Sequence, residues 1–127
     1  MRRLFTLLGM TFAALVACTP AAPASPAASV VLQPGQVMFI ASYADWWSTW
    51  QANAPIVNGL EEEFANQIEF IRLDGDDPAT YDMRQQYGLV QRTRYVLVDS
   101  SGMVMLRWFG PLYYEAVKND IADWLNP

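Results

Sequence analysis

The sequence contains no histidine and only one cysteine among its 127 residues. Without histidine, the chain lacks the side chain that most often titrates near neutral pH and most often binds metal ions. A single cysteine cannot form a disulfide within the chain or build a thiolate zinc cluster. Basic residues are also scarce, eight against thirteen acidic ones, so the basic surface typical of nucleic-acid-binding proteins is absent. We therefore expect no metal, no cofactor and no nucleic-acid partner.

Apolar residues are abundant by contrast, at 53% of the chain, which is enough for one small folded domain. At the N-terminal end, Arg2 and Arg3 precede an almost wholly apolar run at 4–16. The run is short for a membrane span but fits the apolar region of a signal peptide. It ends at Leu15-Val16-Ala17-Cys18, which resembles a bacterial lipobox. The resemblance implies cleavage before Cys18 and lipid attachment to it; the alternative is an ordinary secretory signal with an incidental cysteine.

Residues 18–29 follow as a predicted tether, rich in alanine, proline and serine and without charge. Cleavage before Cys18 would leave six basic and thirteen acidic residues, a formal charge of −7. Such a surface gains no attraction to anionic lipids, so anchoring would depend on acyl chains such as palmitate. We therefore expect a signal peptide at 1–17, a lipidated tether at 18–29 and a folded domain at 30–127. The domain would be held extracytoplasmically, in the periplasm or at the cell surface.

Within the domain, short apolar runs alternate with amphipathic segments. Pro55 falls inside the first amphipathic segment and is expected to kink that helix or to mark a late start. The predicted strands lie at 37–41, 68–73, 95–98 and 104–109, with helices after the first strand, at 78–87 and near the C-terminal end. Strands joined through a helix are expected to be parallel and the hairpin strands antiparallel. The predicted fold class is α/β, a central mixed sheet of about four strands flanked by helices on both faces.

Several short motifs between residues 44 and 110 keep a common spacing. They are Ala44-Asp45-Trp46, Pro55, Asp74, Tyr87-Gly88-Leu89, Gly102 and Gly110. Together they resemble the thioredoxin family, in particular its membrane-tethered members, and the resemblance covers residues 37–125. It implies a thioredoxin-like fold and places Gly110 beside the substrate groove.

The chain departs from the family wherever the resemblance locates its chemistry. The two cysteines of the dithiol correspond to Trp47 and Trp50, the buried acid to Ala41 and the cis-proline to Thr93. A dithiol oxidoreductase needs a low-pKa thiolate at a helix N-terminus and a second cysteine to resolve the mixed disulfide. A cis bond before a residue other than proline is costly, so the Arg92-Thr93 bond is expected to be trans. We therefore predict that the protein is not an enzyme.

The tryptophans in the place of the dithiol mark a candidate binding groove. The resemblance implies that Trp47 is exposed and Trp50 partly buried, and a spacing of four predicts that Trp46 and Trp50 share a helix face. Arginines near an indole gain cation–π stabilisation. The candidate groove for a peptide or protein comprises Trp46, Trp47, Trp50, Arg92, Thr93, Arg94 and Gly110. The alternative is that the tryptophans only fill space and the arginines are simply solvated.

Two acidic segments are not expected to form sites. A calcium-binding EF-hand starting at Asp74 would need glycine and glutamate where the chain has Ala79 and Gln85. Glu61–Glu63 are consecutive helix positions, which cannot converge as paired carboxylates in a cleft. The predicted function is a redox-inactive thioredoxin-like lipoprotein that binds or scaffolds a peptide or protein. The alternative is an accessory component of a thiol-disulfide or protein-folding pathway without its own dithiol.

Overall fold

The computed structural model describes residues 35–92 and 94–127. The expected signal peptide, Cys18, the tether, the first residues of the expected domain and Thr93 therefore lie outside the described residues. The elements in chain order are β1 (Met38–Tyr43), α1 (Ser48–Phe64), β2 (Glu69–Asp74), the 3-10 helix η1 (Pro78–Thr80), α2 (Tyr81–Gln86), β3 (Arg94–Val98), β4 (Val104–Phe109) and α3 (Tyr114–Leu125). Within these ranges, no helix is long and apolar enough to cross a membrane.

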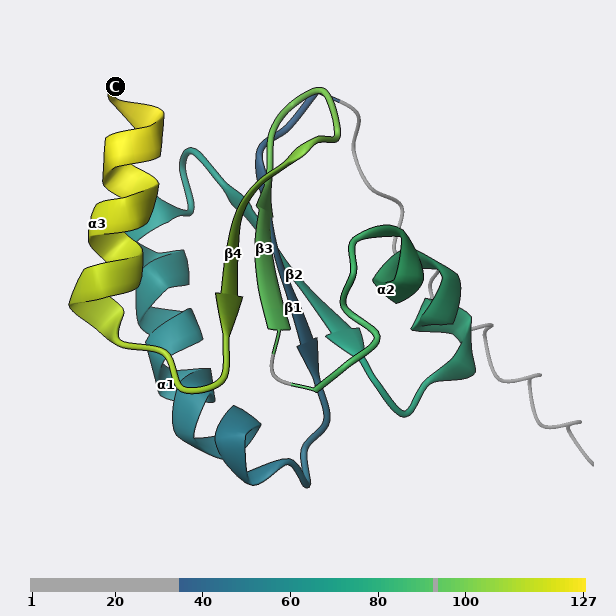
Figure 1. Ribbon diagram of the computed structural model, residues 1–127. Helices are drawn as coiled ribbons and strands as arrows, with labels where there is room; N and C mark the ends of the chain where they lie inside the picture. Colours follow the sequence, from purple (N-terminus) through teal and green to yellow (C-terminus); the bar gives the residue numbers. More distant parts are fainter. Residues whose placement is uncertain (1–34, 93) are drawn as a thin grey trace, which may run out of the picture.

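The four strands form one mixed sheet in the order β2-β1-β3-β4. β1 pairs in parallel with β2 and antiparallel with β3, and β3 pairs antiparallel with β4. Figure 1 shows α1 and α3 together on one side of the sheet and α2 on the other. The predicted α/β class, with helices on both faces of a mixed four-stranded sheet, is confirmed.

Side-chain alternation along β1 divides the core into two clusters. Phe39 and Ala41 face α1 and α3, whereas Met38 and Ile40 face α2, and all four are at most 4% exposed. Five of the six residues of β1 are buried because the strand has neighbours on both edges and helices on both faces. The buried strand β1 therefore fixes the position of its last residue, Tyr43, and the segment that follows Tyr43 forms part of the candidate site.

The helix α1 runs without interruption from Ser48 to Phe64 with Pro55 inside it, so the proline does not mark a late start. Two residues before Pro55 lies Asn53, which is polar but only 2% exposed. Its Nδ2 donates to the Tyr95 hydroxyl at 2.7 Å and to the Gly110 carbonyl at 2.9 Å, and its Oδ1 accepts from the Leu112 N–H at 3.0 Å. A single side chain thus ties α1 to β3 and to the connection between β4 and α3.

Candidate functional site

The residues around the start of α1 lie at the end of the sheet toward which β1 and β2 both point (Figure 1). After β1, the Trp47 N–H donates to the Ala44 carbonyl at 3.0 Å, and the Trp47 carbonyl accepts from the Gln51 N–H at 3.0 Å. The first bond closes a turn and the second begins the helix. The side-chain amide of Gln51 donates to the Asp45 carbonyl at 2.9 Å and fastens that turn to α1.

Trp47 and Trp50 are both buried, each only 8% exposed. The Trp47 ring covers Gly75, where an added Cβ would lie 2.8 Å from the Trp47 Cη2. The Trp50 ring packs against Tyr43 with 5.1 Å between centroids. The expectation that Trp47 is exposed is therefore wrong, because an indole is long enough to reach the space left by a residue without a side chain. Trp47 and Trp50 form the floor of this region.

Trp46 is the exposed member of the group, at 56%. Since α1 begins only at Ser48, Trp46 precedes the helix and does not share a face with the buried Trp50, contrary to expectation. Its ring meets the Trp47 ring edge-on, with 6.0 Å between centroids and 82° between planes. The exposed Trp46 ring therefore packs against the buried Trp47 ring.

Two charged groups hold the Trp46 ring. Its Nε1–H donates to the Asp76 Oδ2 at 2.7 Å. The Arg92 guanidinium carbon lies 4.5 Å from the centroid of the Trp46 ring and 5.7 Å from that of Trp47, within the range of a cation–π contact. We call these three residues, Trp46, Asp76 and Arg92, the Trp46 surface.

The loop after β2 carries Asp76 and is itself held firmly. The Gly75 N–H donates to the Tyr43 carbonyl at 2.6 Å, and the Asp76 N–H donates to the Asp74 Oδ1 at 2.9 Å. Gly75 is needed here because any Cβ would also lie 3.1 Å from the Tyr43 carbonyl oxygen. The end of β2 thus places the Asp76 carboxylate beside the end of β1, where Trp46 lies.

No protein-family model and no curated protein matches the sequence. Solved structures do match the fold. A thioredoxin from Fasciola hepatica aligns with a TM-score of 0.59 and 20% identity, over 71% of this chain and 82% of that one. A chain from a study of the thiol-resolving mechanism in yeast mitochondrial 1-Cys peroxiredoxin aligns with a TM-score of 0.58 and 19% identity, over 70% and 79%. The chain has a thioredoxin-like fold.

Within this thioredoxin-like fold, the two arginines expected in one groove diverge. Arg92 lies over Trp46, whereas the Arg94 guanidinium carbon lies 5.1 Å from the centroid of the Phe109 ring, on the side of the sheet that α2 covers. Arg94 also donates to the Gly88 carbonyl at 3.4 Å and to the side chain of Gln91. Thr93, which joins the two arginines, lies outside the described residues.

The remaining candidate, Gly110, lies in the connection between β4 and α3. It adopts a φ of +65°, which favours glycine, and its carbonyl accepts from Asn53. The structure therefore brings Trp46 and Arg92 together above Trp47, buries Trp50 and directs Arg94 elsewhere.

Sequence reasoning missed Asp76 and Phe109. A signal for Asp76 was present, since the carboxyl ends of parallel neighbouring strands meet at one edge of the sheet, and β1 and β2 are such a pair. A signal for Phe109 lay in the hairpin, whose register places it opposite Arg94. Both residues become visible only when two strands are aligned with each other.

Two phenols near this region have pKa values above the ordinary value of a tyrosine. Burial raises the pKa of the Tyr43 phenol, and the nearby carboxylates of Asp74 and Asp45 raise it further. Burial likewise raises the pKa of Tyr95, against the opposing effect of the hydrogen bond from Asn53. Both phenols therefore stay protonated at neutral pH and act as hydrogen-bonding groups.

Proposed function

We propose that this thioredoxin-like domain binds a peptide or protein partner without catalysing a reaction, and that the Trp46 surface is the centre of its binding site. The observation that carries the proposal is an indole exposed to 56% and held by a carboxylate and a guanidinium. Tryptophan and arginine are both enriched among the residues that dominate binding energy at protein interfaces.

The chemistry available in the chain supports a role other than redox catalysis. The only cysteine, Cys18, precedes the whole domain, and the positions that the family resemblance assigns to the dithiol carry Trp47 and Trp50. Thiol-disulfide exchange requires a thiolate to attack a disulfide sulfur. A hydroxyl such as Ser48 has no redox chemistry of its own.

We further propose that Cys18 is lipidated and that the domain is held at the extracytoplasmic face of a membrane. The support is the order of charged start, apolar run, small residues and cysteine at the N-terminal end. Residues 19–29 in an extended, proline-rich conformation would span about 30 Å at roughly 3 Å per residue. The Trp46 surface would then reach partners close to the membrane.

Two measurements test the proposed function. A photo-crosslinking amino acid in place of Asp45, the exposed neighbour of Trp46, is expected to trap a discrete partner in membranes of the source cells. The same group in place of Glu62, an exposed residue of α1, is the matched control and is expected to trap none. Insulin reduction by the purified chain is expected to stay at background, and thiol-dependent turnover above background would overturn the non-enzymatic assignment.

A further inference from the structure

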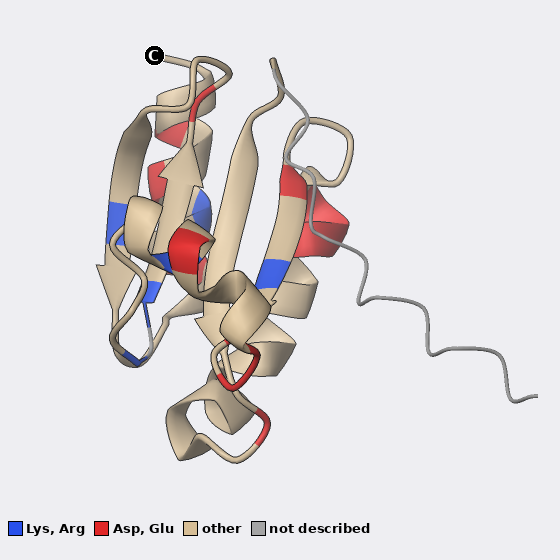
Figure 2. Cartoon of the chain, turned by 90° about the vertical axis from the view of Figure 1, so that its right-hand side faces the viewer, with Lys and Arg blue, Asp and Glu red and all other residues tan. Residues whose placement is uncertain are grey.

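A second group of side chains lies away from the Trp46 surface, on the side of the sheet that α2 covers. Arg94 begins β3 opposite Phe109 of β4, and Arg107 lies two residues before Phe109. Arg107 and Phe109 share a face of β4 because side chains alternate along a strand. Figure 2 looks onto this side of the sheet and shows the basic segments of β3 and β4 next to each other. We call Arg94, Arg107 and Phe109 the β4 patch.

The arginines of the β4 patch have no carboxylate partner among the described residues. All thirteen carboxylate side chains lie between residues 45 and 123, within the described part of the chain. Salt bridges in that part join Arg72 to Glu61 at 3.2 Å and Lys118 to Glu63 at 3.5 Å. None joins Arg94 or Arg107 to a carboxylate. Two like charges on diagonal positions of neighbouring strands repel each other unless an anion lies between them.

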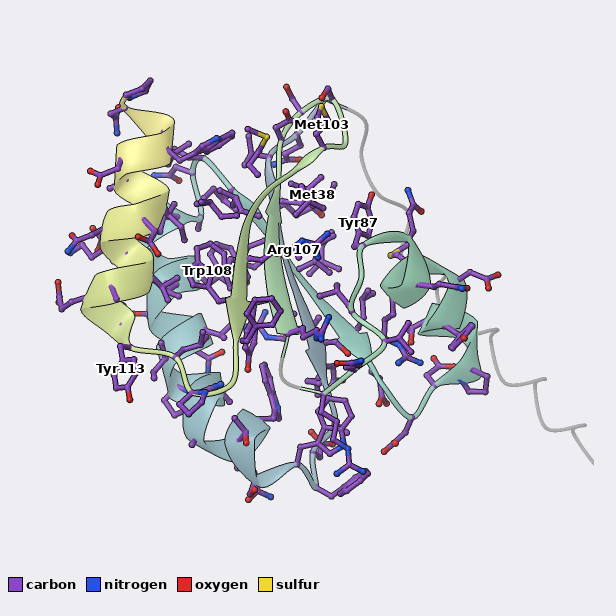
Figure 3. The ribbon with its side chains drawn as sticks, in the orientation of Figure 1. Met38, Tyr87, Met103, Arg107, Trp108 and Tyr113 are labelled. Carbon is purple, nitrogen blue, oxygen red and sulfur yellow. The ribbon has the colours of Figure 1, made fainter. Side chains whose placement is uncertain are left out.

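Backbone carbonyls fix the direction of both guanidinium groups. Arg107 Nη1 donates to the Tyr87 carbonyl at 2.9 Å, and a Cβ on the next residue, Gly88, would lie 2.9 Å from that nitrogen. Arg94 Nη1 donates to the Gly88 carbonyl. Figure 3 shows Arg107 projecting from β4 toward the side of Tyr87. Each guanidinium uses only part of its five donors in this way and keeps the others for a ligand.

Among residues 35–92 and 94–127, the strand that carries the patch is an edge strand. β4 is last in the sheet order, and in Figure 1 no other element lies in front of it. Alternate N–H and C=O groups of an edge strand point away from the sheet and can pair with another extended chain. Met105 and Phe109 are 43% and 59% exposed along this edge. The edge thus offers backbone pairing, apolar contacts and positive charge together.

We propose that β4 and the β4 patch bind an extended acidic segment of a protein partner. The segment adds as a strand beside β4, its carboxylates accept bidentate hydrogen bonds from Arg94 and Arg107, and its apolar side chains cover Phe109 and Met105. The inference rests on the proposed function only in that the domain binds protein; the site is separate from the Trp46 surface.

Two other occupants fit the observations less well. A second copy of the chain pairing β4 with β4 around a twofold axis would bring the two Arg107 side chains near each other, which is repulsive. An anionic membrane surface offers no backbone to pair with β4, and the domain, with six basic against thirteen acidic residues, is repelled by it. An acidic peptide satisfies both the charges and the strand edge.

Fluorescence anisotropy with a labelled peptide of repeating Leu-Thr-Glu-Thr, which places leucine and glutamate on the same face of a strand, tests the proposal on the full chain in neutral detergent micelles. Arg107→Gln is expected to weaken binding about tenfold or more, the effect of losing a charged hydrogen bond. Arg72→Gln removes the same charge from β2, the opposite edge strand, and is the matched control, with an expected change below about twofold. Methylation of alternate backbone nitrogens in the peptide is expected to abolish binding.

Several outcomes would overturn the inference. An equal loss of peptide affinity in Arg107→Gln and Arg72→Gln would mean that the effect comes from the net charge of the domain and not from a contact at the β4 patch. Full binding of the methylated peptide would exclude strand addition. Binding to micelles containing phosphatidylglycerol, or self-association, without peptide binding would assign the patch to lipid or to a second copy. Trp46→Ala is expected to leave peptide affinity unchanged, so failure at the β4 patch is distinguishable from failure of the Trp46 surface.

Discussion

Replacing Asn53 by alanine is expected to destabilise the domain more than any other single polar substitution on α1. Asn53 is 2% exposed and makes three hydrogen bonds, to the Tyr95 hydroxyl, the Gly110 carbonyl and the Leu112 N–H. The substitution removes one side chain and leaves three groups without their partner. A buried polar group left unsatisfied costs about 1–3 kcal/mol, and the three costs overlap because the loop can shift.

We therefore expect Asn53→Ala to lower the free energy of unfolding by about 3–5 kcal/mol. A domain of this size has a total stability of roughly 5–14 kcal/mol, so the loss is a large part of it. Urea denaturation followed by tryptophan fluorescence measures the change from the midpoint at constant slope.

Asn58→Ala is the matched control, since Asn58 lies on the exposed side of the same helix and donates nothing to the core. Its expected cost is within about 0.5 kcal/mol, as for most surface substitutions. Adding Tyr95→Phe to Asn53→Ala removes one of the three groups left without a hydrogen-bond partner. The double variant should regain about 1 kcal/mol of unfolding free energy relative to Asn53→Ala. A cost for Asn53→Ala no larger than that of Asn58→Ala would refute the idea that this network fastens the loop to the helix.

Two further predictions concern the packing around Trp47, and a third concerns the turn between β3 and β4. Gly75→Ala should cost about 1–3 kcal/mol of unfolding free energy, measured by urea denaturation, because its Cβ would lie 2.8 Å from the Trp47 ring. Trp47→Phe should cost less than about 1.5 kcal/mol in the same assay, because the lost packing is offset by removing a buried Nε1–H that has no acceptor among the described residues. NMR titration of Asp99 should give a pKa below its ordinary value of 3.8, because the Ser101 hydroxyl and the Met103 and Ser101 N–H groups donate to its carboxylate. A depressed pKa means that this contribution to stability is present above the unfolded pKa and is lost as the pH falls through the folded value, so an ordinary or raised pKa would contradict it.

The strands, the parallel relation of β1 and β2 and the antiparallel hairpin of β3 and β4 could be predicted because each depends on local pattern, whereas the thioredoxin-like fold was predicted from the family resemblance. An apolar run such as 37–41 indicates a buried strand, and the connection between two strands indicates whether they run parallel or antiparallel. The start of α1 was harder to predict from the sequence. Its N-cap residue, Trp47, makes no side-chain capping bond and is not a residue type that favours the N-cap position. The family resemblance placed the exposed indole at Trp47, whereas the exposed indole is Trp46.

The burial of Trp47 and the divergence of the arginines depend on residues far along the chain. Trp47 is buried because Gly75, on the loop after β2, leaves room for its ring. Arg94 turns toward Phe109 because β4 places that ring opposite it. Neither contact has a sequence signature within one element. The pattern that predicts the strands therefore does not predict which side chains pack together at the ends of the strands.

Trp46 is exposed, but two neighbouring side chains hold its ring in place. The hydrogen bond to Asp76 contributes about 0.5–1.5 kcal/mol and the contact with Arg92 about 0.5–1 kcal/mol. Fixing a side chain costs at most about 2 kcal/mol of rotamer entropy, and less for a residue with two rotatable bonds. The two contacts therefore suffice to keep the exposed ring in one orientation. A partner that covers it gains apolar burial without having to order the indole. This is why we place the centre of binding at Trp46 and not at the buried Trp47 and Trp50, which the family resemblance aligns with the dithiol.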